Sequence, residues 1–354
     1  MTAVDERIRW GIAGTGLIAG EFARDLALVA DAELVAVGSR GTARAAAFGD
    51  EFAVPRRHGS YEALAADPGV DVVYVASPHS AHLAHTLLFL GAGKHVLCEK
   101  PLALSAAQVA RMQAAATDAG RFLMEAVWSR FTPAYRLMLE LVAAGEIGDV
   151  LLVEAEFGFR APFDPAHRLF DPALGGGSIL DIGIYPVQLA HLLLGAPDQV
   201  AVAGVVGSTG VDEHVVAALR YGTGALAVAK SSLRADLPGT ARITGTLGAI
   251  EFPTAMWAPD TLLVRSPTRV PHGGPDPGGA TRIDAPLTGI GLHYQVRHVH
   301  DRLRAGHLDS DVLPPAESLR IAETLDRIRE SLGVRYPADA PEPGTVTAGG
   351  QGGG

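Results

Sequence analysis

Cysteine, lysine and long apolar runs are scarce in this chain, and each shortage excludes a class of protein. Cys98 is the only cysteine among 354 residues, so no internal disulfide can form and a reducing, cytoplasmic location is expected. No apolar run approaches the ~20 residues of a membrane-spanning helix, and the first ten residues lack the apolar core of a signal peptide. The net charge of −10 argues against a nucleic-acid partner.

Lysine occurs at three positions only, which makes each worth inspecting, whereas hydrophobic residues are abundant. They make up 48% of the chain against 19% charged residues, so a sizeable core is expected. The length corresponds to about two domains at roughly 150 residues each. Short apolar runs alternate with amphipathic segments in the first third, which predicts an α/β fold with a doubly wound parallel sheet. The predicted strands are 7–12, 33–37, 71–76 and 95–98, and the predicted helices are 18–29, 42–52, 83–90 and 105–119.

The pattern changes beyond residue 127, which we take as the end of the first domain. A long strand at 149–160 and a helix at 178–194 precede strand-like runs joined by short turns, which predicts a mostly antiparallel sheet in an α+β domain spanning 128–337. These runs are 199–206, 213–221, 225–233, 240–246 and 262–265. Gly222 and Thr223 predict a two-residue hairpin.

The sequence predicts a different kind of structure for each of three further segments in the second half of the chain. Residues 267–286 are rich in glycine and proline and predict a loop, whereas 315–332 predicts a helix that packs back on the first domain. Residues 338–354 have no apolar pattern and predict a disordered tail. One face of the antiparallel sheet needs a cover, so we expect a homodimer formed through it, with a tetramer as the alternative.

A glycine-rich loop follows the first predicted strand and opens a helix. Its pattern is G-x-G-x-x-A on Gly14, Gly16 and Ala19. Gly14 permits the tight turn, Gly16 lets the backbone approach a pyrophosphate, and Ala19 allows close packing of helix on strand. The helix N-terminus then offers unpaired N–H groups to an anion. A bare turn is the alternative, but the position and flanks favour dinucleotide binding.

The end of the second strand favours NADP over NAD. An NAD enzyme usually has an acidic residue there for the ribose 2′-hydroxyl, and this chain has Ser39 and Arg40 instead. The hydroxyl and the guanidinium can both bind a 2′-phosphate, and Arg44 on the next helix can close the pocket. The alternative is a solvated surface arginine.

Two further segments carry titratable groups. Lys100 follows a buried strand at its carboxyl end, where open α/β sheets bind ligands, although an ion pair with Glu99 is also conceivable. Asp181 and Tyr185 lie four residues apart and so on one helical face, directly after three glycines and before Pro186, which interrupts the helix. The alternative for Tyr185 is a core position with its hydroxyl capped by Asp181.

Together, the glycine loop, the Glu99-Lys100-Pro101 triplet and the 175–185 segment resemble one known family. They are typical of the glucose–fructose oxidoreductase, inositol dehydrogenase and rhizopine-catabolism (Gfo/Idh/MocA) family, over about residues 7–337. Segments 125–131, 239–248 and 256–259 are most similar to its NADP-dependent dihydrodiol dehydrogenase and D-xylose 1-dehydrogenase branch. The resemblance implies hydride transfer between NADP and a hydroxyl of a sugar, cyclic polyol or trans-dihydrodiol.

The resemblance also implies roles for individual residues. Lys100 and Tyr185 would form the catalytic pair, with Asp181 as the group that orients it; many family members have a histidine in place of Tyr185. His79 departs from the pattern, since asparagine is common there. The implied cofactor contacts are Gly14, Thr15, Gly16, Leu17, Ile18, Ser39, Arg40, Arg44, Ser77, Pro78, His79, His82, Glu99, Lys100, Trp128 and Arg130, and the implied apolar substrate wall is Trp128, Phe157, Phe159 and Trp257.

Three other interpretations remain open at this level. A zinc site at His79, His82 and His85 lacks a local Cys or carboxylate, so we expect no metal. A non-catalytic sugar sensor can share the fold, but a sensor has no reason to keep both Lys100 and Tyr185. A 3-ketoreductase acting on a nucleotide-linked deoxysugar would need a basic groove, for which the second domain offers Arg160, Arg168, Arg234 and Arg242.

Overall fold

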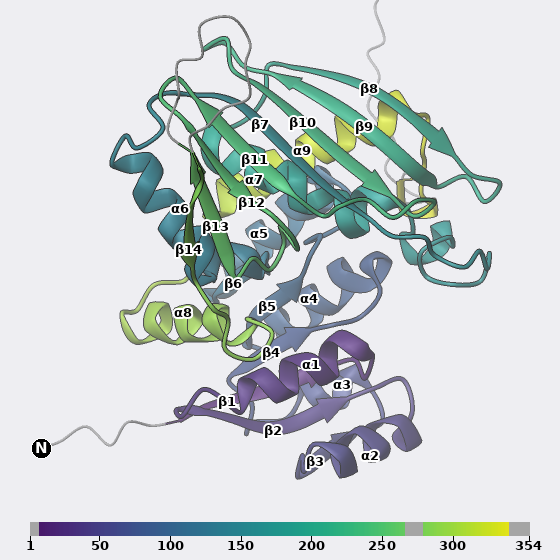
Figure 1. Cartoon of the computed structure of the whole chain (residues 1–354). Helices are drawn as coiled ribbons and strands as arrows, with labels where there is room; N and C mark the ends of the chain where they lie inside the picture. Colours follow the sequence, from purple (N-terminus) through teal and green to yellow (C-terminus); the bar gives the residue numbers. More distant parts are fainter. Residues whose placement is uncertain (1–6, 266–278, 340–354) are drawn as a thin grey trace, which may run out of the picture.

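The computed structural model describes residues 7–265 and 279–339, which fold into two sheets joined by helices (Figure 1). The first sheet is six-stranded and parallel in the order β3-β2-β1-β4-β5-β6. This order is that of a dinucleotide-binding Rossmann sheet and confirms the predicted α/β class. Its strands are β1 (Ile8–Ala13), β2 (Ala32–Gly38), β3 (Arg56–His58), β4 (Val72–Val75), β5 (His95–Glu99) and β6 (Leu123–Ala126).

Helices cover both faces of this sheet because its strands are apolar on both sides. One face packs against α1 (Leu17–Leu26), α2 (Thr42–Glu51) and α8 (His293–Arg304). The other packs against α3 (Tyr61–Ala65), α4 (His82–Gly91) and α5 (Ala106–Ala119). The amide nitrogen of Gln108 donates to the Ser105 hydroxyl, so Ser105 is the N-cap of α5.

The second sheet has eight strands in the order β14-β13-β12-β11-β7-β10-β9-β8. Only β7 and β10 are parallel neighbours; the other described pairs are antiparallel. Its inner face packs on α6 (Pro133–Ala143), α7 (Ile184–Leu194) and α9 (Pro315–Ser331). Its strands are β7 (Val150–Gly158), β8 (Gln199–Val206), β9 (Asp212–Arg220), β10 (Leu226–Ser232), β11 (Ala241–Gly245), β12 (Ala249–Phe252), β13 (Thr261–Arg265) and β14 (Thr281–Asp284).

Helix α9 also contacts the first domain, as a bridge between the two sheets. The Asp326 carboxylate accepts a hydrogen bond from the amide nitrogen of Ala106 at 2.8 Å, and the Pro315 carbonyl accepts one from the Gln113 side chain at 2.7 Å. One described helical stretch, Pro172–Leu194, is long and apolar enough to cross a bilayer, but most of it is buried in the core of the protein.

Three local expectations are corrected by the structure. The predicted loop at 267–286 contains strand β14, which pairs with β13; residues 266–278 lie outside the described part. The hairpin at Gly222 has three loop residues, because Tyr221 pairs with Ala225 and Gly224 takes a positive φ of 90°. Of the predicted tail, Asp339 is held by Arg329 at 2.6 Å in the turn Pro337–Asp339, and the remainder lies outside the described residues.

The three histidines of α8 are buried. His300 accepts from the Trp10 indole at 2.9 Å and lies 3.0 Å from the Asp31 carboxylate. His293 lies near the Asp25 carboxylate, and His298 lies near the Ser310 hydroxyl. Their polar partners come from distant parts of the chain, so a local pattern could not reveal the burial.

Candidate active site

The glycine loop between β1 and α1 has the geometry that its sequence predicts. Gly14 has a φ of 123°, and a Cβ there would lie 2.6 Å from the carbonyl oxygen of Ala76, so only glycine fits. A Cβ on Gly16 would meet nothing within 4 Å, and Leu17, the first residue of α1, is 84% exposed. Thr15 and Ile18 flank these positions. The N-terminus of α1 is therefore open to an anion.

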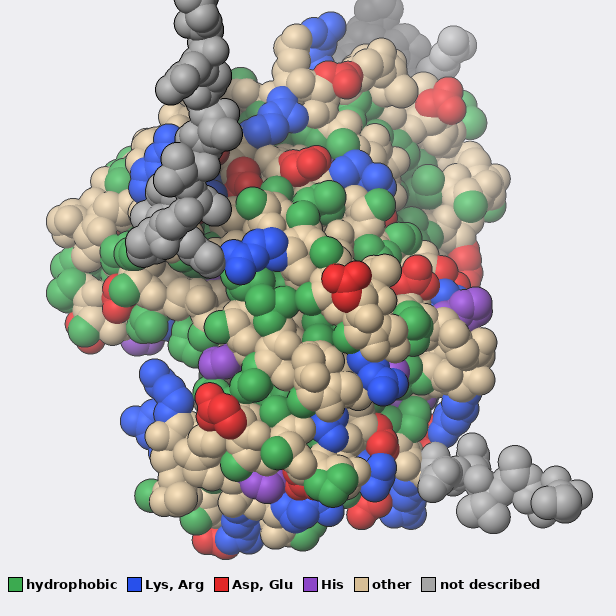
Figure 2. Space-filling view, turned by 180° about the vertical axis from the view of Figure 1, so that it is seen from behind, with side chains coloured by type: hydrophobic (Ala, Val, Ile, Leu, Met, Phe, Trp, Pro, Cys, Tyr) green, Lys and Arg blue, Asp and Glu red, His purple; other side chains and the backbone are tan. Residues whose placement is uncertain are grey.

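Two cationic side chains lie beyond the end of β2. Arg40 and Arg44 are exposed, and neither has an ion pair with a described residue, whereas Ser39 is buried beside them. Both guanidinium groups are close enough to Tyr61 to lower its pKa, although burial raises that pKa overall. Seen from behind, the surface is indented between the two lobes, and Lys or Arg side chains project from the lower lobe at this indentation (Figure 2). The arginines fit a 2′-phosphate.

The loop after β4 is tied to the segment that carries Lys100. The ring of His82 places one nitrogen 2.8 Å from the Pro101 carbonyl oxygen and the other 2.9 Å from that of Ser77. His79, which begins the short turn His79–Ala81 after Pro78, has Nδ1 3.0 Å from the Gly175 carbonyl oxygen. His85 lies 2.9 Å from the Ser77 hydroxyl. The three histidines do not converge, and no metal-holding group of three or more His, Cys, Asp or Glu occurs in the described chain.

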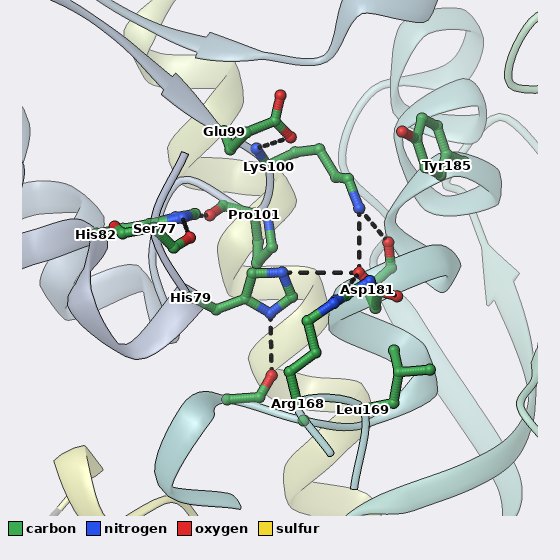
Figure 3. A network of polar contacts seen from close by, with 12 residues as sticks. Ser77, His79, His82, Glu99, Lys100, Pro101, Arg168, Leu169, Asp181 and Tyr185 are labelled. Atoms are coloured by element: carbon green, nitrogen blue, oxygen red, sulfur yellow. Dashed lines mark hydrogen bonds and ion pairs between the residues drawn. The ribbon is translucent and has the colours of Figure 1, made fainter. Parts of the chain in front are cut away.

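Lys100 extends from the end of β5 across to the second domain (Figure 3). Its Nζ donates to the backbone carbonyl of Asp181 at 2.5 Å and lies 3.4 Å from the Asp181 carboxylate. The same Nζ lies 5.1 Å from the centre of the Tyr185 ring. Glu99 does not pair with this ammonium, because its carboxylate accepts hydrogen bonds from the Tyr74 hydroxyl and from the backbone nitrogen of Lys100.

Asp181 lies in a π-helical turn, Ile179–Gly183, that continues into α7. In such a turn each carbonyl pairs with the N–H five residues later, which for Asp181 is the position of Pro186. Proline has no N–H, so Pro186 cannot bond to this carbonyl, which accepts a hydrogen bond from Lys100 Nζ.

Arg168 is a further partner of Asp181 whose role here the sequence did not indicate. Its guanidinium lies 3.0 Å from the Asp181 carboxylate, and His79 Nε2 lies at 3.7 Å. Although burial opposes ionisation, the positive charges of Lys100 and Arg168 hold the pKa of Asp181 well below its usual range. Burial lowers the pKa of His79 to about 3, so its ring is neutral near pH 7. Arg168 comes from an irregular loop, where no periodicity marks it.

The Tyr185 hydroxyl accepts a hydrogen bond from the Trp128 indole at 3.1 Å rather than being capped by Asp181. Burial raises the pKa of Tyr185 above 10, while Lys100 and the Trp128 hydrogen bond act in the opposite direction. Burial lowers the pKa of the Lys100 ammonium, whereas the Asp181 carboxylate raises it. The resulting pKa lies above the ordinary value for lysine. Lys100 is thus a fixed positive charge beside the phenol that favours the phenolate, but burial outweighs it.

Aromatic side chains border this pair. The rings of Phe157 and Trp257 stack with centroids 3.6 Å apart and planes within 7°. The centroid of the Phe157 ring lies 5.9 Å from that of Tyr185 and 6.2 Å from that of Phe159. The structure therefore joins the four predicted wall residues and Tyr185 in one aromatic cluster, with the Trp128 indole bonded to the Tyr185 hydroxyl directly.

Arg130 and Glu99 are engaged inside the protein. The Arg130 guanidinium is 1% exposed, donates to the side chain and backbone carbonyl of Gln188 at 2.8 and 3.0 Å, and pairs with Glu317 at 2.7 Å. The Glu99 carboxyl is buried against Tyr74, and burial raises its pKa. These contacts do not support the predicted cofactor contact of either side chain.

A Rossmann sheet with an open glycine loop, together with a lysine and a tyrosine at the carboxyl edge of that sheet, defines the class of NAD(P)-dependent oxidoreductases. The match to family models is consistent with this class. Residues 8–127 match an oxidoreductase family with an NAD-binding Rossmann fold, and residues 135–251 match the GFO/IDH/MocA C-terminal domain. The chain belongs to the Gfo/Idh/MocA family of oxidoreductases, as its sequence motifs indicate.

Similar proteins are found among enzymes of known activity. Trans-1,2-dihydrobenzene-1,2-diol dehydrogenase of Mus musculus is 40% identical over 94% of this chain and 99% of its own length, and that of Homo sapiens is 37% identical over the same shares. Among solved structures, an aldose-aldose oxidoreductase from Caulobacter crescentus is 27% identical with a TM-score of 0.81, over 92% of this chain and 97% of that one. The protein is an NAD(P)-dependent oxidoreductase that acts on CH–OH groups.

The contacts of Arg130 predict a structural effect of its removal. Arg130→Met removes a fully buried guanidinium and leaves the partly buried Glu317 without its ion-pair partner, so the free energy of unfolding should fall by about 3 kcal/mol, whereas NADP⁺ affinity of the folded protein should change less than about twofold. Urea unfolding and fluorescence titration measure the two quantities. Arg136→Met, at an exposed position of α6, is the matched control. Unchanged stability with weakened NADP⁺ binding would restore Arg130 as a cofactor contact.

Proposed function

We propose that the protein is an NADP-dependent dehydrogenase of trans-dihydrodiols, with sugars and cyclic polyols as the alternative substrates. The observation that carries this proposal is the position of Lys100 Nζ, fixed by Asp181 at 2.5 Å and set against the Tyr185 ring at 5.1 Å. The stacked Phe157 and Trp257 beside it suit a ring with an apolar face. The identity to dihydrodiol dehydrogenases over almost the whole chain supports the same choice.

In the oxidation direction the substrate hydroxyl needs a base and its oxygen needs a nearby positive charge. Tyr185 is the proposed base, and its hydroxyl is oriented by the Trp128 indole. Lys100 stabilises both the phenolate and the developing alkoxide, and Asp181 keeps the ammonium in place. NADP⁺, when bound, supplies the hydride acceptor and a further positive charge that favours the phenolate. Tyr185 returns its proton to solvent after the reaction.

The cofactor preference rests on the residues after β2. Ser39 stands where an NAD enzyme has a carboxylate, and Arg40 and Arg44 carry positive charges that no described carboxylate neutralises. A guanidinium pairs with a phosphate through charge-assisted hydrogen bonds. We infer that NADP⁺ is preferred over NAD⁺ for this reason.

The alternatives from the sequence have less support. A nucleotide-linked deoxysugar would need free arginines for its diphosphate, but three of the four candidates are already ion-paired: Arg168 with Asp181, Arg234 with Glu213 and Arg242 with Glu251. The solved 3-ketoreductase KijD10 from Actinomadura kijaniata, with a TM-score of 0.79 and 27% identity, has a similar fold. The convergence of Lys100 and Tyr185 argues against a sensor without turnover.

We also propose a homodimer through the outer face of the second sheet. Its inner face is covered by helices, whereas Val205, Val216 and Leu226 on the outer face are 41, 37 and 48% exposed. The ion pair between Lys230 and Glu156 lies on the same face. A second copy presents the same apolar and mixed-charge surface, so the face is complementary to itself about a two-fold axis.

Cofactor titrations test the proposed preference. NADP⁺ should bind at least tenfold tighter than NAD⁺, a difference of about 1.4 kcal/mol, which one charge-assisted contact can supply. Arg40→Ala should weaken NADP⁺ binding by at least ~10-fold and change NAD⁺ binding by less than about twofold. Equal affinity of the parent protein for the two cofactors would contradict the assignment.

Kinetics of the catalytic pair test the proposed function, with trans-1,2-dihydrobenzene-1,2-diol compared with D-xylose and myo-inositol. Tyr185→Phe and Lys100→Met should each lower kcat by at least ~10²-fold, and the two losses should not add because the groups act together. The base is the phenolate, which exists above the pKa of Tyr185, so oxidation by the parent enzyme should speed up as the pH rises.

The outcome that contradicts this account is near-normal turnover of Tyr185→Phe in stopped-flow assays. His79 would then be the next candidate base. Because the pKa of His79 is about 3, the pH profile of the reaction would show no histidine ionisation near pH 6.5. NADP⁺ affinity of Tyr185→Phe should stay within about twofold of the parent. Failure of all three substrates would favour the ketoreductase or the sensor.

Sedimentation velocity at micromolar concentration tests the dimer. The parent should sediment as a dimer, and Val216→Asp should shift it toward monomer because a charge is placed in the apolar face. Leu28→Asp, at a similarly exposed apolar position near α1 and away from that sheet, is the control and should not change the mass. A monomeric parent would overturn the proposal, and a tetramer would require a second interface.

A further inference from the structure

One buried carboxylate holds the segment that leads from β14 into α8 against helix α1 (Figure 1). Asp25, in the last turn of α1, is 3% exposed. Its Oδ1 accepts the backbone N–H of Ile290 at 3.1 Å, and its Oδ2 accepts those of Gly291 at 2.9 Å and His293 at 3.3 Å. Three backbone donors of the second domain therefore share a single side chain of the nucleotide-binding domain.

The same segment packs against the indole of Trp128. Gly291 has a φ of 102°, and a Cβ at this position would lie 3.2 Å from Cζ3 and 3.4 Å from Cε3 of the Trp128 side chain. Both atoms belong to the six-membered ring, whereas the nitrogen of the five-membered ring donates to the Tyr185 hydroxyl at 3.1 Å. A displacement of the Gly291 backbone would therefore change the position of this donor.

Two glycines allow the segment to approach both of its neighbours closely. A Cβ on Gly289 would lie 2.2 Å from Asp25 Oδ1, and a Cβ on Gly291 would meet the Trp128 ring. Larger side chains at these positions would displace the carboxylate on one side or the indole on the other. The sequence Gly-Ile-Gly at 289–291 thus fits a segment that transmits the position of α1 to Trp128.

We propose that Asp25 is a positioning residue for the reaction, which acts through Gly291 to keep the Trp128 indole within hydrogen-bond distance of the Tyr185 hydroxyl. This inference rests on the proposed function, in which Tyr185 is the base. Burial raises the pKa of Tyr185, and the Trp128 hydrogen bond acts against that rise, so its loss would disfavour the phenolate. Because α1 begins at the glycine loop, the helix that would bind the cofactor also fixes the donor to the base.

NMR of the indole N–H groups in the ¹⁵N-labelled, NADP⁺-bound protein tests this position directly. The chain has three tryptophans, and Trp128→Phe assigns the Trp128 signal. In Asp25→Asn an NH₂ group faces backbone N–H groups in either orientation of the amide, so the Trp128 proton should move upfield as its hydrogen bond is lost. The Trp10 indole donates to His300, two turns further along α8, and its signal should stay. An unchanged Trp128 signal, or the loss of both hydrogen bonds, would overturn the proposal.

Kinetics with trans-1,2-dihydrobenzene-1,2-diol give the functional readout. Asp25→Asn should lower kcat by at least ~10-fold, because a small misplacement at the base is costly, and should change NADP⁺ affinity by less than about twofold. Asp31→Asn is the matched control, since Asp31 also pairs with α8, at His300 and Arg304, away from Trp128. Equal kcat in the parent and Asp25→Asn would contradict the role of Asp25. If the parent oxidises none of the substrates, the proposed function fails, whereas the indole signal still decides whether Asp25 positions Trp128.

A second variant displaces the indole without changing Asp25. Gly291→Ala places a methyl group against the Trp128 ring and should reproduce both the lower kcat and the shifted indole signal. Gly224→Ala is its control, because Gly224 has a similar φ of 90° and a Cβ there would meet nothing within 4 Å. Equal effects of the two glycine variants would attribute the loss to backbone strain and would contradict the contact with Trp128.

Discussion

The buried contact between Lys100 and Asp181 is the interaction on which the rest of the site depends. Lys100 belongs to the nucleotide-binding domain and Asp181 to the second domain, so this contact joins the two at the point where, in the proposed function, the substrate meets the cofactor. Removing two charges from water is costly unless they are paired and hydrogen-bonded. Here the ammonium has a carbonyl and a carboxylate within reach, and Arg168 is a second cation on the same carboxylate. The Lys100 ammonium lies 5.1 Å from the centre of the Tyr185 ring, beside which the proposed reaction would form an alkoxide.

The backbone around Asp181 is adapted to that contact. Asp212, fully buried on β9, accepts hydrogen bonds from the Ile179 amide and from the Ser178 hydroxyl, both at 2.7 Å, and so anchors the first turn of the π-helical segment. Pro186 supplies no N–H at the other end of the segment. The Asp181 carbonyl accepts a hydrogen bond from Lys100 Nζ. Irregular helical turns of this kind are frequent at functional sites, and here the irregularity has an identifiable electrostatic use.

Much of this architecture could be predicted from local sequence. The alternation of strands and helices, the glycine loop and the position of Lys100 after a buried strand depend on neighbours in the chain, and the structure agrees with them. Arg168 could not be predicted as a partner of Asp181, because it lies on an irregular loop and only the fold brings the two together. The same holds for strand β14, whose pairing with β13 overrides a glycine- and proline-rich context, and for the buried His300, whose partners Trp10 and Asp31 are far away in the sequence. The family resemblance implied cofactor contacts for Glu99 and Arg130. In the structure, both side chains bond to other residues of the protein instead.

The account rests on the claim that Lys100 makes Tyr185 a stronger acid than burial alone would allow. The direct measurement is the ionisation of Tyr185 in the NADP⁺ complex, followed by ¹³C NMR of labelled tyrosine, with the signal assigned among the seven tyrosines through Tyr185→Phe. Removal of a neighbouring positive charge disfavours the phenolate, so the pKa of Tyr185 in Lys100→Met should be higher than in the parent by at least about one unit, or about 1.4 kcal/mol. An equal pKa in the two proteins would contradict the account.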